Sequence, residues 1–519
     1  MRVLVAEKLA QEGVDLLAVD HDVDVRTGLS RGDFLAALPG YDALLVRSGV
    51  QVDAQAITAG RRLTVIGRAG VGVDNIDIAA ATAAGIVVVN APTGNTIAAA
   101  EHTLALLFAL ARHVPTADAS MRLGQWRRSA FVGRELDGKT IGVVGLGKIG
   151  MAVADRARAL GMDVVGYDPY VTEEAASLHG IRRLPLWDVL AAADAVTVHV
   201  PLTRDTRGLI GARELAAMKP QAFVINVARG GVIEEAALAA ALADRTIAGA
   251  AVDVYSTEPP APDNPLRTAP NTILTPHLGA STEEAQTRVA VEAAEQVRDA
   301  LAGRPARHAV NAPLLTPETA QALAPYLPLA RTLGQFYAQF ASDLSDLTLE
   351  VAGDLAAYDA SALAAATLGG ILETHTEERV NVVNAPALAK ARGITLVERR
   401  TPNAGRYSSL LTLSGSRSVA GTVASGETRL VSLEGHVMDL APAPHMLVSR
   451  HRDRPGTIGL VGQALGEADV NISAMHLART EPRADAFMFL ALDDPVPPEV
   501  ADRIRSFDAV VDLWLIDLE

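Results

Sequence analysis

Residues 139–168, KTIGVVGLGKIGMAVADRARALGMDVVGYD, decide the fold of the first half of this 519-residue chain. A β-branched run leads into a Gly-x-Gly-x-x-Gly turn formed by Gly145, Gly147 and Gly150. A helical pattern follows the turn, and a second β-branched run ends at Asp168. This order predicts a βαβ unit whose turn and helix N-terminus bind the pyrophosphate of a dinucleotide. Asp168 would accept hydrogen bonds from both ribose hydroxyls and repel a 2′-phosphate, which favours NAD over NADP.

The rest of residues 1–310 continues the pattern of short apolar runs and alanine-rich helices. Such runs, bounded by turn residues, are typical of parallel strands buried on both faces. Ten strands are too many for one ordinary sheet, so we expect two α/β domains, with a helix at about 96–114 leading from the first to the second. The expected strands are 2–6, 43–48, 63–70, 85–90, 139–145, 163–167, 195–200, 222–228, 248–254 and 271–277.

The pattern changes beyond residue 301, where 301–328 holds five prolines and little strand character. We expect a mixed α+β segment up to about residue 440, with strands in ITLVERR, SSLLTLSG and RLVSLEG and a hairpin or meander with glycine turns over 421–436. The last 75 or so residues alternate as βαββαβ. The predicted domains are 1–95 with 286–310, 96–285, 311–440 and 441–519.

The composition narrows the function classes. With 49% apolar and 21% charged residues the chain is globular, and the absence of cysteine excludes disulfide scaffolds, thiolate metal sites and cysteine nucleophiles. A net charge of −15 makes nucleic acid and anionic membranes poor partners. Neither Met1–Gly13 nor the apolar stretch Thr103–Ala111 resembles a signal peptide or membrane span. We therefore expect a cytoplasmic protein with no metal site.

Three polar residues follow predicted strands in the second domain: Arg229, Glu258 and His277. Ligands of open parallel sheets bind at these carboxyl ends. Hydride transfer from a hydroxy acid to NAD needs a base for the hydroxyl proton, and histidine suits this role because its ordinary pKa lies near neutrality. It also needs a cation for the substrate, and the arginine fork grips a carboxylate. Taken singly, each residue could equally belong to a solvated turn.

The motifs VGLGKIG, NVARGG, DVYSTEPP and TPHLGAS occur in this order, and with them residues 1–310 resemble the D-isomer-specific 2-hydroxyacid dehydrogenases. The resemblance implies that Arg229 binds and polarises the substrate, that His277 is the acid/base, and that Glu258 holds the histidine tautomer. It also implies that Arg229 and His277 lie against NAD. Further implied NAD contacts are Lys148, Ile149, Pro201, Thr206, Val227, Ala228, Asp253, Gly279 and Ala280.

In the first domain, Arg47 and Ser48 end one expected strand and Arg68 ends another, before Gly70 and Val71. Two arginines beside a hydride site indicate a substrate with more negative charge than one carboxylate. These segments resemble the phosphoglycerate dehydrogenases, which implies 3-phospho-D-glycerate as substrate and 2-oxoglutarate as a possible substrate in reverse. The segment 123–136 resembles a dimerisation loop whose Trp126 and Arg128 reach the neighbouring subunit.

The C-terminal βαββαβ unit resembles an ACT domain, a small-molecule sensor that pairs edge to edge. The resemblance implies that His451, Asp453 and Asn471 hold L-serine as effector, although these residues could equally be a helix cap and a turn. Residues 315–440 resemble the intervening domain of the long phosphoglycerate dehydrogenases. The dimerisation loop and the ACT edge together imply a homo-oligomer, a tetramer or a dimer.

Two other functions remain open from the sequence. One is the dehydrogenation of a different, unphosphorylated D-2-hydroxy acid. The other is a non-catalytic, NAD-sensing protein of the corepressor kind, which would share the dinucleotide motif but would have no need of the first-domain arginines or of an ACT-like domain.

Overall fold

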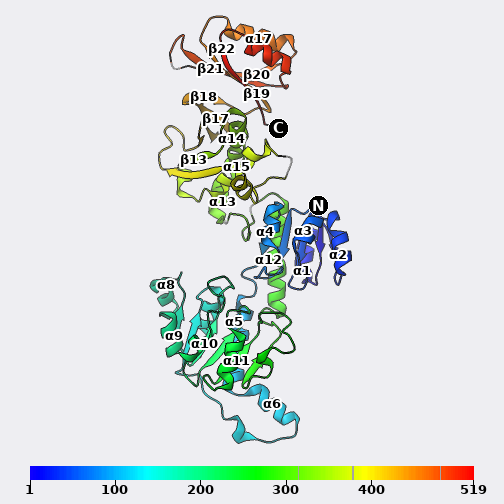
Figure 1. Ribbon diagram of the computed structural model, residues 1–519, viewed down its shortest axis with the longest axis vertical. Coiled ribbons are helices and arrows are strands. Elements are labelled where there is room, and N and C mark those ends of the chain that lie inside the picture. The colour runs from blue at the N-terminus through cyan, green and yellow to red at the C-terminus, as the bar shows by residue number, and fades with distance from the viewer. Residues whose placement is uncertain (305, 314, 377–378, 480, 519) are drawn as a thin grey trace.

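The computed structural model describes residues 1–304, 306–313, 315–376, 379–479 and 481–518. Its strands form four sheets, which follow one another along an elongated molecule (Figure 1). The second sheet lies at one end, the first sheet and the third sheet occupy the middle, and the fourth sheet lies at the other end.

The first sheet is parallel, with the strand order β2-β1-β3-β4-β5. Helices α2, α3 and α4 cover one face, and α1 and α12 cover the other, so that the strands between them are buried. The strands are β1 Arg2–Val5, β2 Asp22–Val25, β3 Ala43–Val46, β4 Val65–Arg68 and β5 Val87–Asn90. The helices are α1 Gln11–Ala18, α2 Arg31–Ala37, α3 Ala54–Ala59, α4 Ile78–Ala83 and α12 Glu283–Leu301.

The second sheet is also parallel, with the order β12-β11-β10-β9-β6-β7-β8. Helices α5 and α7 pack on one face and α9, α10 and α11 on the other. Its strands are β6 Thr140–Val144, β7 Asp163–Tyr167, β8 Arg182–Arg183, β9 Ala195–Val198, β10 Phe223–Asn226, β11 Gly249–Val252 and β12 Thr272–Leu274. Its helices are α5 Thr96–Ala111, α6 Val114–Arg122, α7 Lys148–Ala159, α8 Glu173–Leu178, α9 Leu186–Ala192, α10 Ala212–Ala216 and α11 Glu235–Ala243.

The third sheet is mixed, with the order β14-β13-β15-β16-β17-β18, in which only β13 and β14 run parallel. Its strands are β13 Asp346–Gly353, β14 Thr395–Thr401, β15 Ser409–Ser414, β16 Ser418–Ala424, β17 Glu427–Leu433 and β18 His436–Leu440. The accompanying helices are α13 Pro317–Leu323, α14 Leu327–Phe340, α15 Ser361–Glu373 and α16 Ala385–Ala391.

The fourth sheet is antiparallel, with the order β20-β21-β19-β22. The chain order of its elements is the predicted βαββαβ. Helices α17 and α18 cover one face of this sheet. The elements are β19 His445–Arg452, α17 Thr457–Glu467, β20 Ile472–Arg479, β21 Asp485–Leu492, α18 Pro498–Arg505 and β22 Val510–Asp517.

The fold class predicted from the sequence is confirmed, two parallel sheets followed by an α+β segment and a βαββαβ unit. Strands β2, β8, β13 and β18 were not among the expected ones. Strand β8 has only two residues, and the alternating DVDV of β2 is only partly buried at the edge of its sheet. An apolar run is the signal of a strand buried on both faces, so short edge strands escape it.

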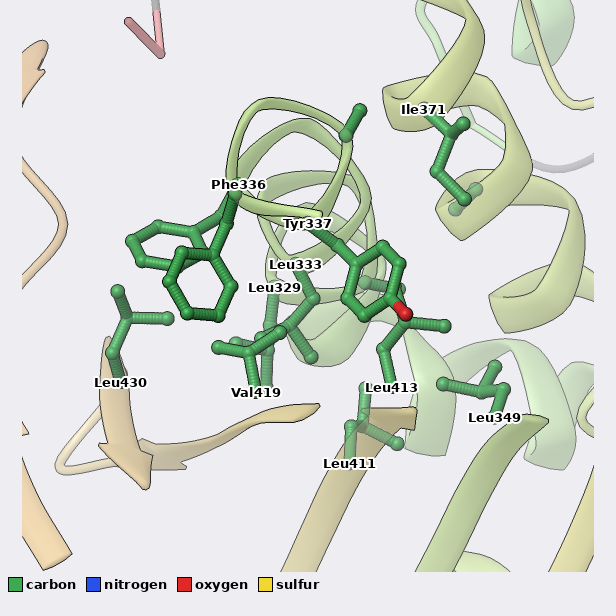
Figure 2. Close-up of a cluster of buried hydrophobic side chains, with 14 of the residues drawn as sticks. Leu329, Leu333, Phe336, Tyr337, Leu349, Ile371, Leu411, Leu413, Val419 and Leu430 are labelled. Atoms are coloured by element: carbon green, nitrogen blue, oxygen red, sulfur yellow. The ribbon is translucent and has the colours of Figure 1, made fainter. Parts of the chain in front are cut away.

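The third and fourth sheets share one hydrophobic core. Helix α14 lies at its centre, where Phe336 and Tyr337 are fully buried against strands of the third sheet (Figure 2). From the fourth sheet, Phe489 belongs to the same cluster, and Trp514 meets Phe340 edge-on at a ring-centroid distance of 4.8 Å. The face of the fourth sheet that its own helices leave uncovered is therefore buried against the third sheet.

Among the described residues no single helix is long and apolar enough to cross a membrane. Helices α5 and α6, bent by 62° relative to each other, pass the criteria of length and composition only when taken together. Helix α5 is largely buried in the core of the second sheet.

Helices α14 and α15 cross closely at Gly334 of α14 and Gly370 of α15. This close approach generates a stability prediction. A Cβ on Gly370 would lie 2.1 Å from the Arg331 carbonyl oxygen, whereas a Cβ on Gly369 would meet nothing within 4 Å. We expect Gly370→Ala to lower the free energy of unfolding of this segment by about 1–3 kcal/mol, because the helices must separate. The control Gly369→Ala should be neutral or gain up to about 1 kcal/mol. Urea unfolding measures both, and equal effects would contradict the close crossing.

Candidate active site

The glycine turn that follows β6 has the geometry that a dinucleotide requires. Gly145 has a φ of 95°, which favours glycine, and a Cβ on Gly150 would lie 1.9 Å from the Gly145 carbonyl oxygen. Gly147 caps α7, and a Cβ built there would meet no atom within 4 Å. The turn therefore leaves room beside the helix N-terminus, as the approach of a pyrophosphate demands.

Asp168 follows β7 directly and lies against this turn. Its carboxylate accepts hydrogen bonds from the backbone N–H groups of Leu146, at 2.9 Å, and Tyr170, at 2.8 Å. An acidic group is thus held at the end of the second strand of the βαβ unit, where a ribose would lie beside the turn. These features fit NAD.

The other predicted NAD contacts also follow strands of the second sheet. Thr206 donates a hydrogen bond to the Pro201 carbonyl at 2.5 Å, which closes the turn after β9. Gly279 packs so closely on Val227 that a Cβ there would lie 2.9 Å from the valine side chain. The contacts are distributed as Lys148 and Ile149 after β6, Pro201 and Thr206 after β9, Val227 and Ala228 after β10, Asp253 after β11, and Gly279 and Ala280 after β12.

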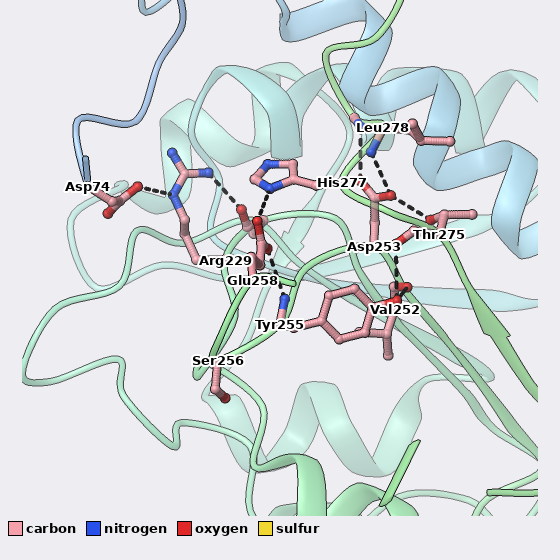
Figure 3. A network of polar contacts seen from close by, with 12 residues as sticks. Asp74, Arg229, Val252, Asp253, Tyr255, Ser256, Glu258, Thr275, His277 and Leu278 are labelled. Atoms are coloured by element: carbon pink, nitrogen blue, oxygen red, sulfur yellow. Dashed lines mark hydrogen bonds and ion pairs between the residues drawn. The ribbon is translucent and has the colours of Figure 1, made fainter. Parts of the chain in front are cut away.

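His277 and Glu258 form a hydrogen-bonded pair in which His277 Nδ1 lies 2.7 Å from Glu258 Oε2 (Figure 3). The other carboxylate oxygen accepts the Tyr255 N–H at 3.0 Å. Partial burial alone would raise the pKa of Glu258, but the hydrogen bonds from His277 and Tyr255 hold it below its ordinary value. The glutamate is therefore ionised at neutral pH. Its bond to Nδ1 leaves Nε2 as the ring nitrogen for a substrate.

Asp253 anchors the loop that carries His277. This carboxylate is fully buried and accepts the N–H groups of Leu278, at 2.8 Å, and Gly279, at 2.9 Å (Figure 3). His102, on α5, lies 3.2 Å from it. Burial would raise the pKa of Asp253, but the hydrogen bonds from His102, Leu278 and Thr275 lower it. His277 itself has a left-handed φ of 57°, so its backbone depends on this anchoring.

Arg229 joins the two parallel sheets. Its Nε lies 3.3 Å from the carboxylate of Asp74, which follows β4 of the first sheet, and its NH1 donates to the Ala228 carbonyl at 2.7 Å (Figure 3). The carboxyl ends of the two sheets thus meet at the site, and the arginine is placed between them.

Arg68 ends β4 and is mostly buried next to other guanidinium groups. Burial, together with the charges of Arg229 and Arg47, lowers its pKa to about 10. Its Nε is buried and has no hydrogen-bond partner among the described residues. The guanidinium lies over Gly70, where a Cβ would be 1.6 Å from Arg68 NH1. Three arginines that repel one another, one with an unsatisfied donor, form a site suited to an anion.

The other predicted substrate residues lie in two places. Ser48 is exposed beside Arg47, and the Val71 carbonyl accepts a hydrogen bond from Asn90 at 2.6 Å. Trp126 and Arg128 are exposed and follow α6, which lies at the second-sheet end of the molecule (Figure 1). The chain therefore does not bring these last two residues to its own His277.

Two of the three predicted effector residues are held by partners within the fourth sheet and its loops. His451 is buried, and burial lowers its pKa. Asp453 accepts hydrogen bonds from Arg479 at 2.5 Å and from the Arg483 N–H at 3.0 Å. Asn471 donates to Asp493 at 2.6 Å. All three lie near the ends of strands. Asp453 and Asn471 already have partners that a ligand would have to replace or join, whereas the buried Nδ1 of His451 has no hydrogen-bond partner among the described residues.

Three residues of the site escaped the sequence analysis: Glu7, Asp74 and His102. His102 lies in α5, whose sequence indicates only a helix connecting the two domains, and Asp74 lies in a glycine-rich loop. Both become site residues only through tertiary contacts, His102 with Asp253 and Asp74 with Arg229. Glu7 follows β1, and the same strand-end signal that indicated Arg47 could have found it. No group of three or more potential metal ligands occurs among the described residues.

The comparisons with known proteins agree with this geometry. Three family models match in succession: "D-isomer specific 2-hydroxyacid dehydrogenase, NAD binding domain" over 104–279, "D-3-phosphoglycerate dehydrogenase intervening domain" over 322–434, and "ACT domain" over 445–509. A crystal structure of an NAD-dependent formate dehydrogenase from Staphylococcus aureus in complex with NAD has a TM-score of 0.53 and 27% identity, over 59% of this chain and 97% of that one. Fold and site thus define the class of D-2-hydroxyacid dehydrogenases that use NAD.

Relatives that match along the whole length decide the family. A D-3-phosphoglycerate dehydrogenase from Synechocystis is 46% identical, over 100% of this chain and 95% of its own length. One from Bacillus subtilis is 40% identical, over 100% and 99%. The chain belongs to the D-3-phosphoglycerate dehydrogenase family, in its long form with intervening and ACT domains.

The buried Asp253 predicts a pH-dependent loop. Because its pKa is lowered on folding, its contribution is complete above the unfolded value of about 3.9 and is lost as the pH falls through the folded value. We expect Asp253→Asn to speed amide hydrogen exchange of residues 275–279 about 10- to 100-fold at pH 7, since the backbone donors lose a charged acceptor. The difference from the parent should shrink below pH 4. The control Thr275→Val removes one side-chain donor, and an effect as large as that of Asp253→Asn would contradict the anchoring role.

Proposed function

We propose that the chain oxidises 3-phospho-D-glycerate to 3-phosphooxypyruvate with NAD, the first step of L-serine synthesis. The observation that carries the proposal is the His277–Glu258 pair beside the arginines contributed by both sheets. The family membership supports the same activity, since the relatives from Synechocystis and B. subtilis bear its name.

In this proposal the two negative groups of the substrate are divided between the arginines. Arg229, next to His277, binds the carboxylate and polarises the C2 oxygen. Arg68 and Arg47 bind the phosphate, whose charge offsets the burial and the mutual repulsion that together lower the pKa of Arg68. A substrate with a single carboxylate would leave the first-sheet arginines uncompensated, which disfavours an unphosphorylated hydroxy acid.

The proton of the C2 hydroxyl passes to Nε2 of His277. Glu258, ionised and bonded to Nδ1, keeps the proton on Nδ1 and stabilises the imidazolium that forms. Asp253 holds the backbone of the loop so that the ring faces the cleft between the sheets. NAD, when bound along the glycine turn, supplies the hydride acceptor. The same residues in reverse would reduce 2-oxoglutarate to 2-hydroxyglutarate.

L-serine is the proposed effector, bound by His451, Asp453 and Asn471 of the ACT domain. The core shared by the ACT domain and α14 supports a route for its effect, since a shift of the fourth sheet moves side chains packed on the third. The proposed assembly is a homo-oligomer, a tetramer or a dimer. The exposed Leu123, Trp126 and Val132 support a role of the segment beyond α6 in pairing, with Trp126 and Arg128 entering the neighbouring site.

The boundaries 1–95 with 286–310, 96–285, 311–440 and 441–519 stay predictions, as does the cytoplasmic location. The corepressor-like alternative is disfavoured by the long-form relatives and by the arginines of the first sheet, for which partner recruitment has no use.

Removal of the acid/base should abolish turnover and spare cofactor binding. We expect His277→Ala to lower kcat for NADH oxidation with 3-phosphooxypyruvate by about 10²–10⁴-fold. Affinity for NADH, followed by fluorescence, should stay within about threefold, because the glycine turn is unchanged. The kcat of Glu258→Gln should lie between those of the parent and His277→Ala, and its pH–rate profile should be altered. Glu174→Gln, at an exposed position, serves as control. Near-normal turnover of His277→Ala would refute the assignment.

Serine should reduce the turnover of the full chain if the ACT domain is a sensor. We expect L-serine to bind by calorimetry and to inhibit NADH oxidation, and Asn471→Ala to weaken both by about tenfold, the loss of roughly one charged hydrogen bond. Gln463→Ala, on α17 of the same domain, is the control. Turnover that is indifferent to serine, without measurable binding, would reduce the domain to an assembly role and leave the dehydrogenase proposal intact.

A further inference from the structure

The first sheet has an unassigned cavity at the point where its strand order reverses. The order β2-β1-β3-β4-β5 places β1 between β2 and β3. The connection from β1 to β2 therefore runs across the sheet in one direction, and the connection from β2 to β3 runs in the opposite direction. Ligands of open parallel sheets bind in the crevice that such a reversal opens at the carboxyl ends. A cavity of about 600 Å³ lies there, lined by residues that follow β1, β2 and β3. The second sheet is expected to use its corresponding crevice for NAD.

The charge in this cavity is mainly positive. Lys8, Arg31 and Arg47 line it, together with Glu7 and Asp53. Both carboxylates are already engaged, since Glu7 accepts the N–H groups of Arg47, Gly49 and Val50, and Asp53 binds Arg31 at 2.5 Å. The side chains of Lys8 and Arg47 have no hydrogen-bond or ion-pair partner in the part of the chain that the structure describes. Two cations are thus left for a ligand.

The remaining lining is apolar and well supported. Leu29 and Val50 are half-buried and Phe34 is buried, all three packed in the core on the α2–α4 side of the first sheet. Arg31 also donates to the Gln51 carbonyl at 3.0 Å and lies over the Phe34 ring, so it fixes the loop after β3 to α2. This lining favours an anion that carries an apolar body over a bare inorganic ion.

We propose that this crevice binds a small organic anion, a phosphate ester or carboxylate with an apolar body, held by Lys8 and Arg47. The site lies beyond Arg47 when viewed from Arg68, because β3 separates the crevice from β4 and neighbouring strands are about 4.8 Å apart. An occupant therefore draws Arg47 away from the substrate phosphate. It raises KM and leaves kcat unchanged.

The test uses phenyl phosphate as probe, titrated calorimetrically into the full chain. An Arg68→Gln background removes the guanidinium proposed to bind the substrate phosphate, so that the crevice dominates the signal. We expect binding to survive in this background. Lys8→Met, which keeps the aliphatic stem, should weaken it about fivefold, and Thr27→Asp, which places a carboxylate at the rim, about tenfold or more. Thr27→Asn, of the same shape without the charge, and Lys390→Met, an exposed lysine on α16, should bind as the parent.

A kinetic measurement distinguishes this site from the reaction site. With Arg68 restored, phenyl phosphate should raise KM for 3-phosphooxypyruvate, and Thr27→Asp should reduce this effect while its turnover without the probe stays normal. The kinetic arm rests on the proposed function, but the calorimetric arm does not, so an inactive protein that still binds the probe would refute only the proposed function. Loss of binding in the Arg68→Gln background, or equal affinity in Lys8→Met, Thr27→Asp and Lys390→Met, would overturn the crevice site.

Discussion

Parallel strands present all their carboxyl ends at one edge of a sheet, and in this chain two such edges meet. Every part of the site depends on that constraint. His277, Glu258 and Arg229 follow strands of the second sheet, and Arg47 and Arg68 follow strands of the first. Residues separated by more than two hundred positions in the sequence therefore surround one cleft, and the Asp74–Arg229 ion pair marks where the two edges touch.

The sequence was most informative where a local motif and a strand end coincide. The glycine turn, Asp168 and the three catalytic candidates could be located because each follows a recognisable apolar run. What escaped depends on tertiary contact. His102 becomes part of the site only because α5 packs beside the loop after β12. The lowered pKa of Arg68 arises from its burial in the folded chain and, after that, from arginines elsewhere in the sequence. Strands β2 and β8 were missed because edge strands need little apolar surface.

The arginines of the site repel one another, and the fold reduces or tolerates this repulsion in several ways. Asp74 compensates Arg229, and Gly70 lets the Arg68 guanidinium lie flat on the backbone. Glu7 satisfies the backbone after β3, so it holds the segment that carries Arg47 without pairing with the guanidinium. Arg47 and Arg68 are therefore preorganised for an anion, since neither guanidinium has a partner among the described residues to release before one binds.

The shared core of the third and fourth sheets bears on the inheritance of this architecture. Detached from α14, the ACT sheet would expose Phe487, Phe489 and Trp514, and the hydrogen bonds between Gln339 and the Asp517 backbone would be lost. The third-sheet segment and the ACT domain therefore behave as one unit in recombination. A recombination point between them would expose an apolar surface on each, whereas a point before α13 would leave this core whole. A gene that acquired or lost regulation in one step would be expected to gain or lose both together.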